Sequence, residues 1–270
     1  MDKLHEKYAQ LKKLLRGYGS AAIAFSGGVD SSFLLKTAGE VLGDRAIAVT
    51  AAPPFVPGRE LAEAAAFCRE HRIRQIVLPA EAFSLEKVRK NPPDRCYRCK
   101  KELFSRMRER ALEEGFETVA EGSNADDLSD YRPGMKALQE LGIRSPLLEV
   151  GLTKEEIREL SREMCLTTWD KPSFACLASR IPVGEEISDK KLEMIDRSEQ
   201  FLLDCGFRQF RVRMHGNLAR IELLPQELEK AAKPVMRKKI TKALQEIGFR
   251  YVTLDLTGYR TGSMNEVQSV

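Results

Sequence analysis

The chain has 270 residues, of which 43% are hydrophobic and 31% are charged, and its net charge is +4. This composition is typical of a globular protein with an apolar core, and no stretch approaches the ~18 consecutive apolar residues of a membrane span. The mild positive charge does not by itself indicate nucleic-acid binding. The first residues mix charges and lack an apolar segment, which argues against a signal peptide, so we expect a cytoplasmic protein.

The first part of the chain alternates short apolar segments with amphipathic ones. We expect strands at 20–25, 46–50, 75–78 and 117–120, and helices at 31–42, 57–71, 100–114, 133–141 and 153–164. Strands that are apolar on both faces and separated by helices form a parallel sheet covered on both sides. The sequence therefore predicts an α/β domain with a doubly wound parallel sheet over residues 1–165. Ligands of such sheets bind at the carboxyl ends of the strands, which here are followed by the segments 26–32, 50–59 and 121–132.

The pattern changes near residue 165. Residues 167–186 resemble a loop, and a helix at 189–203 follows. Two alternating strands at 210–214 and 219–223, a helix at 234–247 and a strand at 251–256 complete the chain. We therefore expect a smaller α+β domain over residues 166–270, which begins with the loop that carries Cys176.

A glycine-rich turn joins the first expected strand to the first expected helix. It consists of Ser26, Gly27, Gly28, Val29, Asp30, Ser31 and Ser32. The unpaired N–H groups of a helix start and its positive dipole end bind anions, and glycine lets the backbone approach them closely. Asp30 is suited to hold Mg2+ between phosphates. The Walker pattern is absent, because no lysine stands in the turn.

The bland interpretation of this turn is a Gly-Gly bend that caps an ordinary helix. The seven-residue string, however, matches the pyrophosphatase-type loop of the PP-loop ATPases. That resemblance implies cleavage of ATP between the α- and β-phosphates and adenylation of a substrate oxygen. From the neighbouring strand ends we add Thr50, Gly122, Asn124 and Asp126 to the residues expected to bind ATP. The string indicates the superfamily and says nothing of the substrate.

Six cysteines occupy positions 68, 96, 99, 165, 176 and 205. Cys96 and Cys99 form a C-x-x-C pair, which we place on a loop before a helix, and Cys176 lies in a polar segment. Three cysteines without an obvious fourth ligand favour a [4Fe–4S] cluster with one open iron. Redox-active or persulfide-carrying cysteines, and a zinc site completed by His215, are the alternatives. We expect the other three cysteines to be packed as small apolar side chains.

Three segments carry a wider resemblance: 26–32, 121–127 and 171–180. Together they look like the LarE family of ATP-dependent sulfurtransferases, over nearly the whole chain. The resemblance implies a substrate, pyridinium-3,5-biscarboxylic acid mononucleotide, whose carboxylates become thiocarboxylates. The product serves the nickel-pincer nucleotide of lactate racemase. The resemblance also implies a homo-oligomer.

Two chemistries occur in that family. In one, the cysteine at the position of Cys176 gives up its own sulfur and ends as dehydroalanine. In the other, the same cysteine and a C-x-x-C pair hold a [4Fe–4S] cluster that passes on sulfide or sulfur from another donor. Because this chain has Cys96 and Cys99 as well as Cys176, it resembles the cluster-type branch, and we take Cys176 and Asp30 as its catalytic residues.

Arg211 and Arg213 alternate on an expected strand and therefore face the same side. Two guanidinium groups on one face suit the phosphate of a mononucleotide. With the resemblance, Glu199, Ser179 and Arg180 join them as the expected substrate-phosphate site. The alternative is a solvated arginine face.

Three other functions compete with sulfur transfer to a small molecule. A cluster-dependent tRNA thiolation enzyme would share the phosphate loop and the cysteines, but no RNA-binding module or basic patch with interleaved aromatic residues is present, so we do not expect a nucleic-acid partner. A regulatory nucleotide-binding module would leave the cysteines unexplained. An amidotransferase-like synthetase would need a glutaminase domain, which the sequence lacks.

Overall fold

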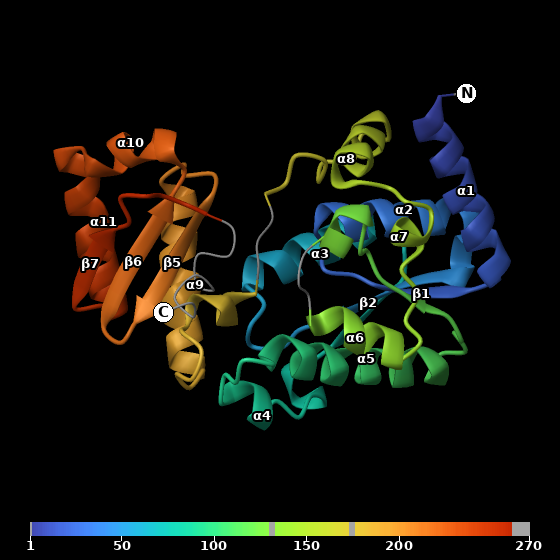
Figure 1. Cartoon of the computed structure of the whole chain (residues 1–270), viewed down its shortest axis with the longest axis horizontal. Coiled ribbons are helices and arrows are strands. Elements are labelled where there is room, and N and C mark those ends of the chain that lie inside the picture. Colours follow the sequence, from blue (N-terminus) through green and yellow to red (C-terminus); the bar gives the residue numbers. More distant parts are fainter. Residues whose placement is uncertain (1, 130–132, 173–175, 261–270) are drawn as a thin grey trace. The chain divides into compact units, whose positions relative to one another are not determined.

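The computed structural model describes residues 2–129, 133–172 and 176–260 (Figure 1). The chain divides into two compact units. The N-terminal unit consists of Met1–Lys87 and Asp94–Phe174, and the C-terminal unit of Val88–Pro93 and Ala175–Val270. The sequence placed the boundary near residue 165. Among the described residues, no helix has the length and apolar character needed to cross a membrane.

The N-terminal unit is built on a four-stranded sheet. Its strands are β1 (Ala21–Ala24), β2 (Ala46–Ala51), β3 (Gln75–Leu78) and β4 (Val119–Ala120). They lie in the order β3-β2-β1-β4, and every neighbouring pair is parallel. This confirms the predicted parallel sheet, although the fourth strand is shorter than the predicted 117–120.

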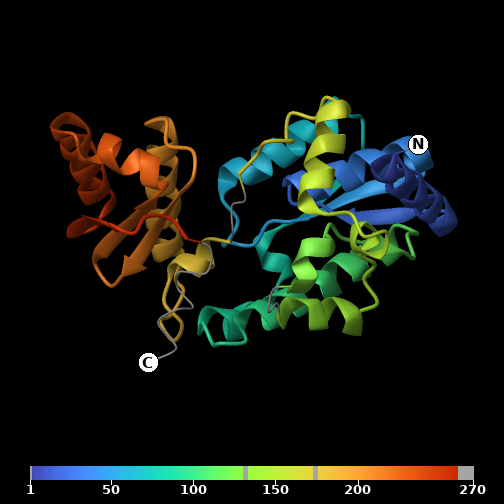
Figure 2. The same ribbon diagram turned by 45° about the horizontal axis from the view of Figure 1, so that its top comes forward.

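Helices cover both faces of this sheet. They are α1 (Lys3–Tyr18), α2 (Val29–Leu42), α3 (Gly58–Glu70), α5 (Arg95–Glu113), α6 (Pro133–Glu140), α7 (Pro146–Glu149) and α8 (Lys154–Glu163), and the short α4 (Glu86–Arg89) spans the change between units. Helices α1, α2 and α8 pack together on one face, whereas α5 and α6 lie on the other (Figures 1 and 2). Strand β1 is buried along its whole length, because small residues let helices approach it from both sides.

Helix α5 begins earlier than predicted. We expected Cys96 and Cys99 on a loop before a helix at 100–114, but both lie within α5, at its N-terminal end. Asp94 precedes the helix, and its carboxylate accepts a hydrogen bond from Nε of Arg98 at 2.8 Å. This ion pair at i, i+4 supports the extra turn, so the loop placement of the cysteine pair was wrong.

The C-terminal unit is a smaller α+β structure, as predicted. Its elements are α9 (Asp189–Asp204), β5 (Phe210–His215), β6 (Leu218–Leu223), α10 (Leu228–Ala232), α11 (Pro234–Ile247) and β7 (Tyr251–Leu254). Strands β5 and β6 form an antiparallel hairpin, and β7 joins β6 in parallel. Asn91 is buried and donates to the carbonyls of Ile181 and Pro182, at 3.3 and 2.7 Å, which ties the segment Val88–Pro93 to this unit.

Candidate functional site

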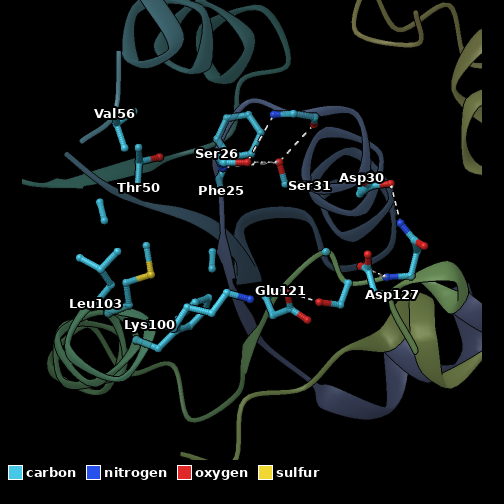
Figure 3. A pocket seen from close by; sticks show the side chains of 18 of the residues that line it. Phe25, Ser26, Asp30, Ser31, Thr50, Val56, Lys100, Leu103, Glu121 and Asp127 are labelled. Atoms are coloured by element: carbon cyan, nitrogen blue, oxygen red, sulfur yellow. Dashed lines mark hydrogen bonds between the residues drawn. The ribbon is translucent and has the colours of Figure 1, made fainter. Parts of the chain in front are cut away.

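A cavity of about 520 Å³ lies at the carboxyl ends of β1, β2 and β4 (Figure 3). Its walls come from the three segments that follow these strands, and from α3, α5 and α8. The predicted ATP-binding residues that line it are Ser26, Gly28, Asp30, Ser31, Thr50, Gly122, Asn124 and Asp126. Gly27, Val29 and Ser32 belong to the same turn but not to the lining, and Val29 and Ser32 are buried. The fold thus gathers residues that are about 100 positions apart in the sequence at one strand edge, where α/β sheets bind ligands.

The turn between β1 and α2 has the backbone geometry of an anion site. Gly27 has a φ of +73°, in the left-handed region that favours glycine. Gly28 is the N-cap residue of α2, and it provides no side-chain hydrogen bond to the helix. The first N–H groups of α2 on the cavity side are therefore not capped by a side chain. Ser26 Oγ and Ser31 Oγ lie 3.1 Å apart beside them. A Cβ on Gly122 would lie 3.0 Å from the backbone nitrogen of Ser31, so only glycine lets β4 approach the turn this closely.

Asp30 lies at the centre of a polar network. Its Oδ1 accepts a hydrogen bond from Nδ2 of Asn124 at 3.3 Å, and its other oxygen forms an ion pair with the ammonium group of Lys154. Asn124 is itself held, because its N–H donates to Asp127 at 3.0 Å and its Oδ1 accepts from the N–H of Asp126 at 3.0 Å. The network fixes a carboxylate in the first turn of α2, which is the kind of ligand that Mg2+ prefers.

Two lysines supply positive charge to the cavity. Lys154 is the first residue of α8, which begins with a capping box formed by Thr153 and Glu156. Lys100 follows Cys99 directly on α5, and its side chain points from that helix into the cavity (Figure 3). The phosphate loop contains no lysine, so these two ammonium groups come to the site from other helices.

The opposite end of the cavity is apolar. Val56 from the segment after β2 and Leu103 from α5 lie there (Figure 3). Leu61 from α3 and Met107 from α5 also line the cavity. Thr50 stands at the end of β2, where its Oγ1 accepts a hydrogen bond from Nε2 of Gln75 at 2.9 Å. A cavity with one apolar end and one end rich in N–H donors and cations fits a nucleotide, with the base at the first and the phosphates at the second.

The cysteines differ in exposure. Cys96 is exposed and Cys99 is half-buried on α5, and Cys176 is exposed at the start of Leu177–Arg180 in the C-terminal unit. Burial raises the pKa of the Cys68 thiol to about 12, in keeping with a packed side chain. Cys165 is exposed, contrary to expectation. Within the described residues, no three His, Cys, Asp or Glu side chains form a group that could hold a metal ion.

Arg211 and Arg213 are buried on β5, with 3% and 5% of their surfaces exposed, so they do not form a solvated face. Arg213 donates from Nη2 to Glu222 at 2.9 Å and from Nη1 to the carbonyl of Ser179 at 3.0 Å. The guanidinium group of Arg211 lies 5.0 Å from the centre of the Tyr259 ring. Burial and the neighbouring charge of Arg180 lower the pKa of Arg211 to about 10. The group therefore retains its charge at neutral pH.

Arg180 and Glu199 form a fully buried pair in the same unit. Nε and Nη2 of Arg180 donate to the two carboxylate oxygens of Glu199 at 2.8 and 2.9 Å. Burial alone would raise the pKa of Glu199, but the charge and hydrogen bonds of Arg180 bring that pKa below its ordinary value. The structure thus places all five expected substrate-phosphate residues in one region: Ser179, Arg180, Glu199, Arg211 and Arg213.

The chain is 36% identical over 267 residues to the pyridinium-3,5-bisthiocarboxylic acid mononucleotide synthase of Lactiplantibacillus plantarum, and the match covers 98% of this chain and 96% of that protein. The chain belongs to the LarE family. It is also 41% identical over 264 residues to an uncharacterized protein of Synechocystis, with 98% of both chains covered. A glutamine-hydrolyzing GMP synthase of Thermoplasma acidophilum has one subunit that is 27% identical over 199 residues, with 69% of this chain and 64% of that subunit covered. No family model matches the chain.

Sequence reasoning missed three residues of this LarE family member, two in the cavity of the N-terminal unit and one beside the arginines of the C-terminal unit. Lys100 and Lys154 lie on helices far from the phosphate loop in sequence, and no local pattern marks them as facing it. Glu222 was missed as the partner of Arg213, although the hairpin pairing of β5 with β6 carried a signal for it. In that register Arg211 lies directly opposite Glu222. The expected turn between the two strands sets this register, so it was enough to identify the Glu222 carboxylate as a neighbour of the arginines.

Proposed function

We propose that this LarE family member is an ATP-dependent sulfurtransferase that converts the carboxylates of pyridinium-3,5-biscarboxylic acid mononucleotide to thiocarboxylates in nickel-pincer nucleotide cofactor biosynthesis. The observation that carries the proposal is the 36% identity, over nearly the full length of both chains, to a synthase of the bisthiocarboxylic acid mononucleotide. The amphipathic cavity at the phosphate loop supports the use of ATP.

A carboxylate is a poor electrophile, because its oxygen is a poor leaving group. In the proposed reaction a carboxylate oxygen attacks the α-phosphorus of ATP and pyrophosphate leaves. A sulfur nucleophile then attacks the carbonyl carbon, and AMP departs with the original oxygen. The N–H groups at the start of α2 and the ammonium groups of Lys100 and Lys154 would stabilise the phosphate charge, and Asp30 would hold Mg2+.

For sulfur delivery, we propose that Cys96, Cys99 and Cys176 hold a [4Fe–4S] cluster, as in the cluster-type branch of the family. When bound, such a cluster supplies an iron with an open coordination position for sulfide or sulfur from another donor. Cys96 lies in the first turn of α5 and Cys99 directly after it, near the positive end of the helix, which stabilises thiolate charge. If the cluster is absent, Cys176 itself is the alternative sulfur source.

The phosphate of the mononucleotide is proposed to bind in the C-terminal unit at the arginine cluster around Arg211. Buried guanidinium groups bind phosphate more strongly than exposed ones, because water does not screen them. We further propose that the protein works in the cytoplasm and as a homo-oligomer.

Anaerobically purified protein, incubated with ATP, Mg2+, sulfide and the biscarboxylate mononucleotide, tests the proposal. We expect AMP to form only when the mononucleotide is present, and the mass of the mononucleotide to show the replacement of oxygen by sulfur. Asp30→Asn is the matched control, because it keeps the side-chain shape and removes the negative charge of the proposed metal ligand. Absence of AMP with the mononucleotide, or sulfur found in added tRNA instead, would contradict the proposal.

The state of Cys176 separates the two sulfur routes. A broad absorption shoulder near ~400 nm in the anaerobic protein would support thiolate-ligated iron and sulfide. Conversion of Cys176 to dehydroalanine after turnover, detected by peptide mass spectrometry, would instead show that the cysteine itself was consumed.

A further inference from the structure

The backbone of Cys176 is held from inside the C-terminal unit. Its carbonyl oxygen accepts a hydrogen bond from Nη1 of Arg180 at 3.0 Å and another from the N–H of Ser179 at 3.0 Å. The side chain of Cys176 is exposed, whereas that of Arg180 is 0% exposed. A solvent-facing cysteine is thus attached through its own carbonyl to a buried cation.

Arg180 cannot move independently of the structure around it. Its Nε and Nη2 donate hydrogen bonds to both carboxylate oxygens of Glu199, and its Nη1 also donates to Ser179 Oγ at 2.9 Å. Glu199, on α9, in addition accepts the backbone N–H of Val212 on β5 at 3.0 Å. The guanidinium plane is therefore fixed by a helix and a strand at once.

A second buried arginine holds the other end of the same turn. Nη1 of Arg213 donates to the carbonyl of Ser179 at 3.0 Å, and its Nη2 is paired with Glu222, which is 0% exposed. The turn that starts at Cys176 is therefore fastened by two guanidinium groups, each of which is oriented by a buried carboxylate. Such double anchoring keeps a reactive residue within the narrow geometry that chemistry requires.

We propose that Arg180, oriented by Glu199, is a positioning residue for Cys176 and not a ligand of the substrate phosphate. The inference rests on the proposed function, in which Cys176 takes part in sulfur transfer. A phosphate ligand must present N–H groups to the substrate, but Nε and Nη2 of Arg180 donate to Glu199, and its Nη1 donates to the Cys176 carbonyl and to Ser179 Oγ. Arg180 acts on the reaction indirectly, by fixing the position of the Cys176 backbone.

Arg180→Lys and Glu199→Gln test this in the full-length protein. Lysine keeps the positive charge but cannot span Glu199 and the Cys176 carbonyl with one planar fork. Arg89→Lys is the matched control, because Arg89 lies in the same unit but forms its ion pair with Asp189, at 2.7 Å, and donates to the carbonyl of Ile187. Thermal unfolding checks that each variant is folded. If Arg180→Lys does not fold, the nearly isosteric Glu199→Gln carries the test.

The first readout is amide hydrogen exchange in the protein without substrates. The N–H of Ser179 should exchange about tenfold faster in Arg180→Lys, because the carbonyl that accepts it is no longer fixed, whereas the amides between β5 and β6 should keep their protection. Arg89→Lys should match the wild type. Unchanged exchange at Ser179 would overturn the proposal, whether or not the enzyme is active.

The second readout separates positioning from binding. In Arg180→Lys the Kd of the mononucleotide should stay within about threefold of the wild type, while the rate of thiocarboxylate formation at saturating substrate should fall by about tenfold or more. A Kd raised about tenfold would identify Arg180 as a phosphate ligand and overturn the proposal. If the wild type binds no mononucleotide, the proposed function fails, and the exchange measurement still decides whether Arg180 positions Cys176.

Discussion

The ammonium group of Lys154 forms an ion pair with the carboxylate of Asp30, the residue expected to hold the metal. Both side chains line the cavity, with 32% and 22% of their surfaces exposed. Under the proposed function, Mg2+ bound to Asp30 competes with Lys154 for the negative charge of this carboxylate. A Lys154 side chain displaced by the metal would then lie next to the phosphates.

This competition predicts the effect of Lys154→Met on magnesium dependence. Partly exposed ion pairs contribute ~0.2–1 kcal/mol, so the Mg2+ concentration for half-maximal AMP formation should fall by up to about fivefold. The measurement is a magnesium titration at fixed ATP. Lys36→Met removes a surface lysine that is paired with Glu40 outside the cavity and should leave the titration unchanged. An unchanged or higher magnesium requirement in Lys154→Met would contradict the competition.

Lys100 and Lys101 are neighbours on α5 with different surroundings, which allows a paired test. Lys100 points into the cavity, whereas Lys101 donates to Glu140 at 2.9 Å and to the hydroxyl of Tyr97 at 3.0 Å. Charge-assisted hydrogen bonds contribute ~1.5–3 kcal/mol, so Lys100→Met should weaken ATP binding by about tenfold or more in calorimetric titrations. Lys101→Met should leave ATP affinity nearly unchanged. Equal losses in both variants would show that the charge of the helix, and not the position of Lys100, affects the nucleotide.

The strands could be predicted because their amino-acid composition indicates that they are buried. Strands β1 and β2 are apolar on both faces, and the alternation in β5 and β6 matches a hairpin. Helix α1 was missed although Leu4, Leu11 and Leu15 have helical spacing, because most of its remaining residues are charged or polar. Leu11 and Leu15 are fully buried, so packing against the rest of the unit stabilises this helix more than its own composition does.

The phosphate loop could be located from sequence because its chemistry is contiguous. The ion pair between Lys154 and Asp30 joins residues 124 positions apart and could not be, since only the packing of α8 beside α2 brings them together. The burial of Arg211 and Arg213 could not be predicted from the sequence either, because alternating arginines have the same pattern on a solvated strand as on a covered one. Tertiary contacts decide such cases.

Gly122 packs against the backbone of the phosphate loop, and its replacement by alanine tests how closely the two segments must approach. A Cβ there would lie 3.0 Å from the nitrogen of Ser31 and 3.2 Å from the carbonyl carbon of Asp30. Backbone atoms cannot yield as a side chain does, so we expect a loss of about 1–3 kcal/mol in the free energy of unfolding and ATP binding weakened by about tenfold. Denaturant unfolding and nucleotide titration measure the two effects. Gly17→Ala is the control, because nothing lies within 4 Å of its added Cβ in helix α1. That variant should bind ATP normally and be as stable as the wild type or more so.

Arg211 offers a test of the substrate-phosphate site that is independent of the nucleotide cavity. If its guanidinium group binds the mononucleotide phosphate, Arg211→Ala should weaken that binding by roughly ten- to hundred-fold, because such bonds contribute ~1.5–3 kcal/mol. Arg211→Lys should cost nearly as much, since an ammonium group lacks the planar fork. ATP affinity should not change, because the residues that line the nucleotide cavity belong to the N-terminal unit.

The lowered pKa of Arg211 adds a pH signature to the same prediction. Burial and the charge of Arg180 bring this pKa to about 10, well below the ordinary value of an arginine, so the folded protein loses this proton at a pH where the unfolded chain still keeps it. Bound phosphate favours the charged guanidinium group, so mononucleotide affinity should fall as the pH rises through about 10. Arg211→Ala should lack that part of the pH dependence.

Arg197→Ala, which removes an exposed arginine of α9 paired with Glu193, should behave as the wild type in both titrations. If Arg211→Ala binds the mononucleotide as the wild type does, the buried arginine has a structural role, and the phosphate must bind to other residues.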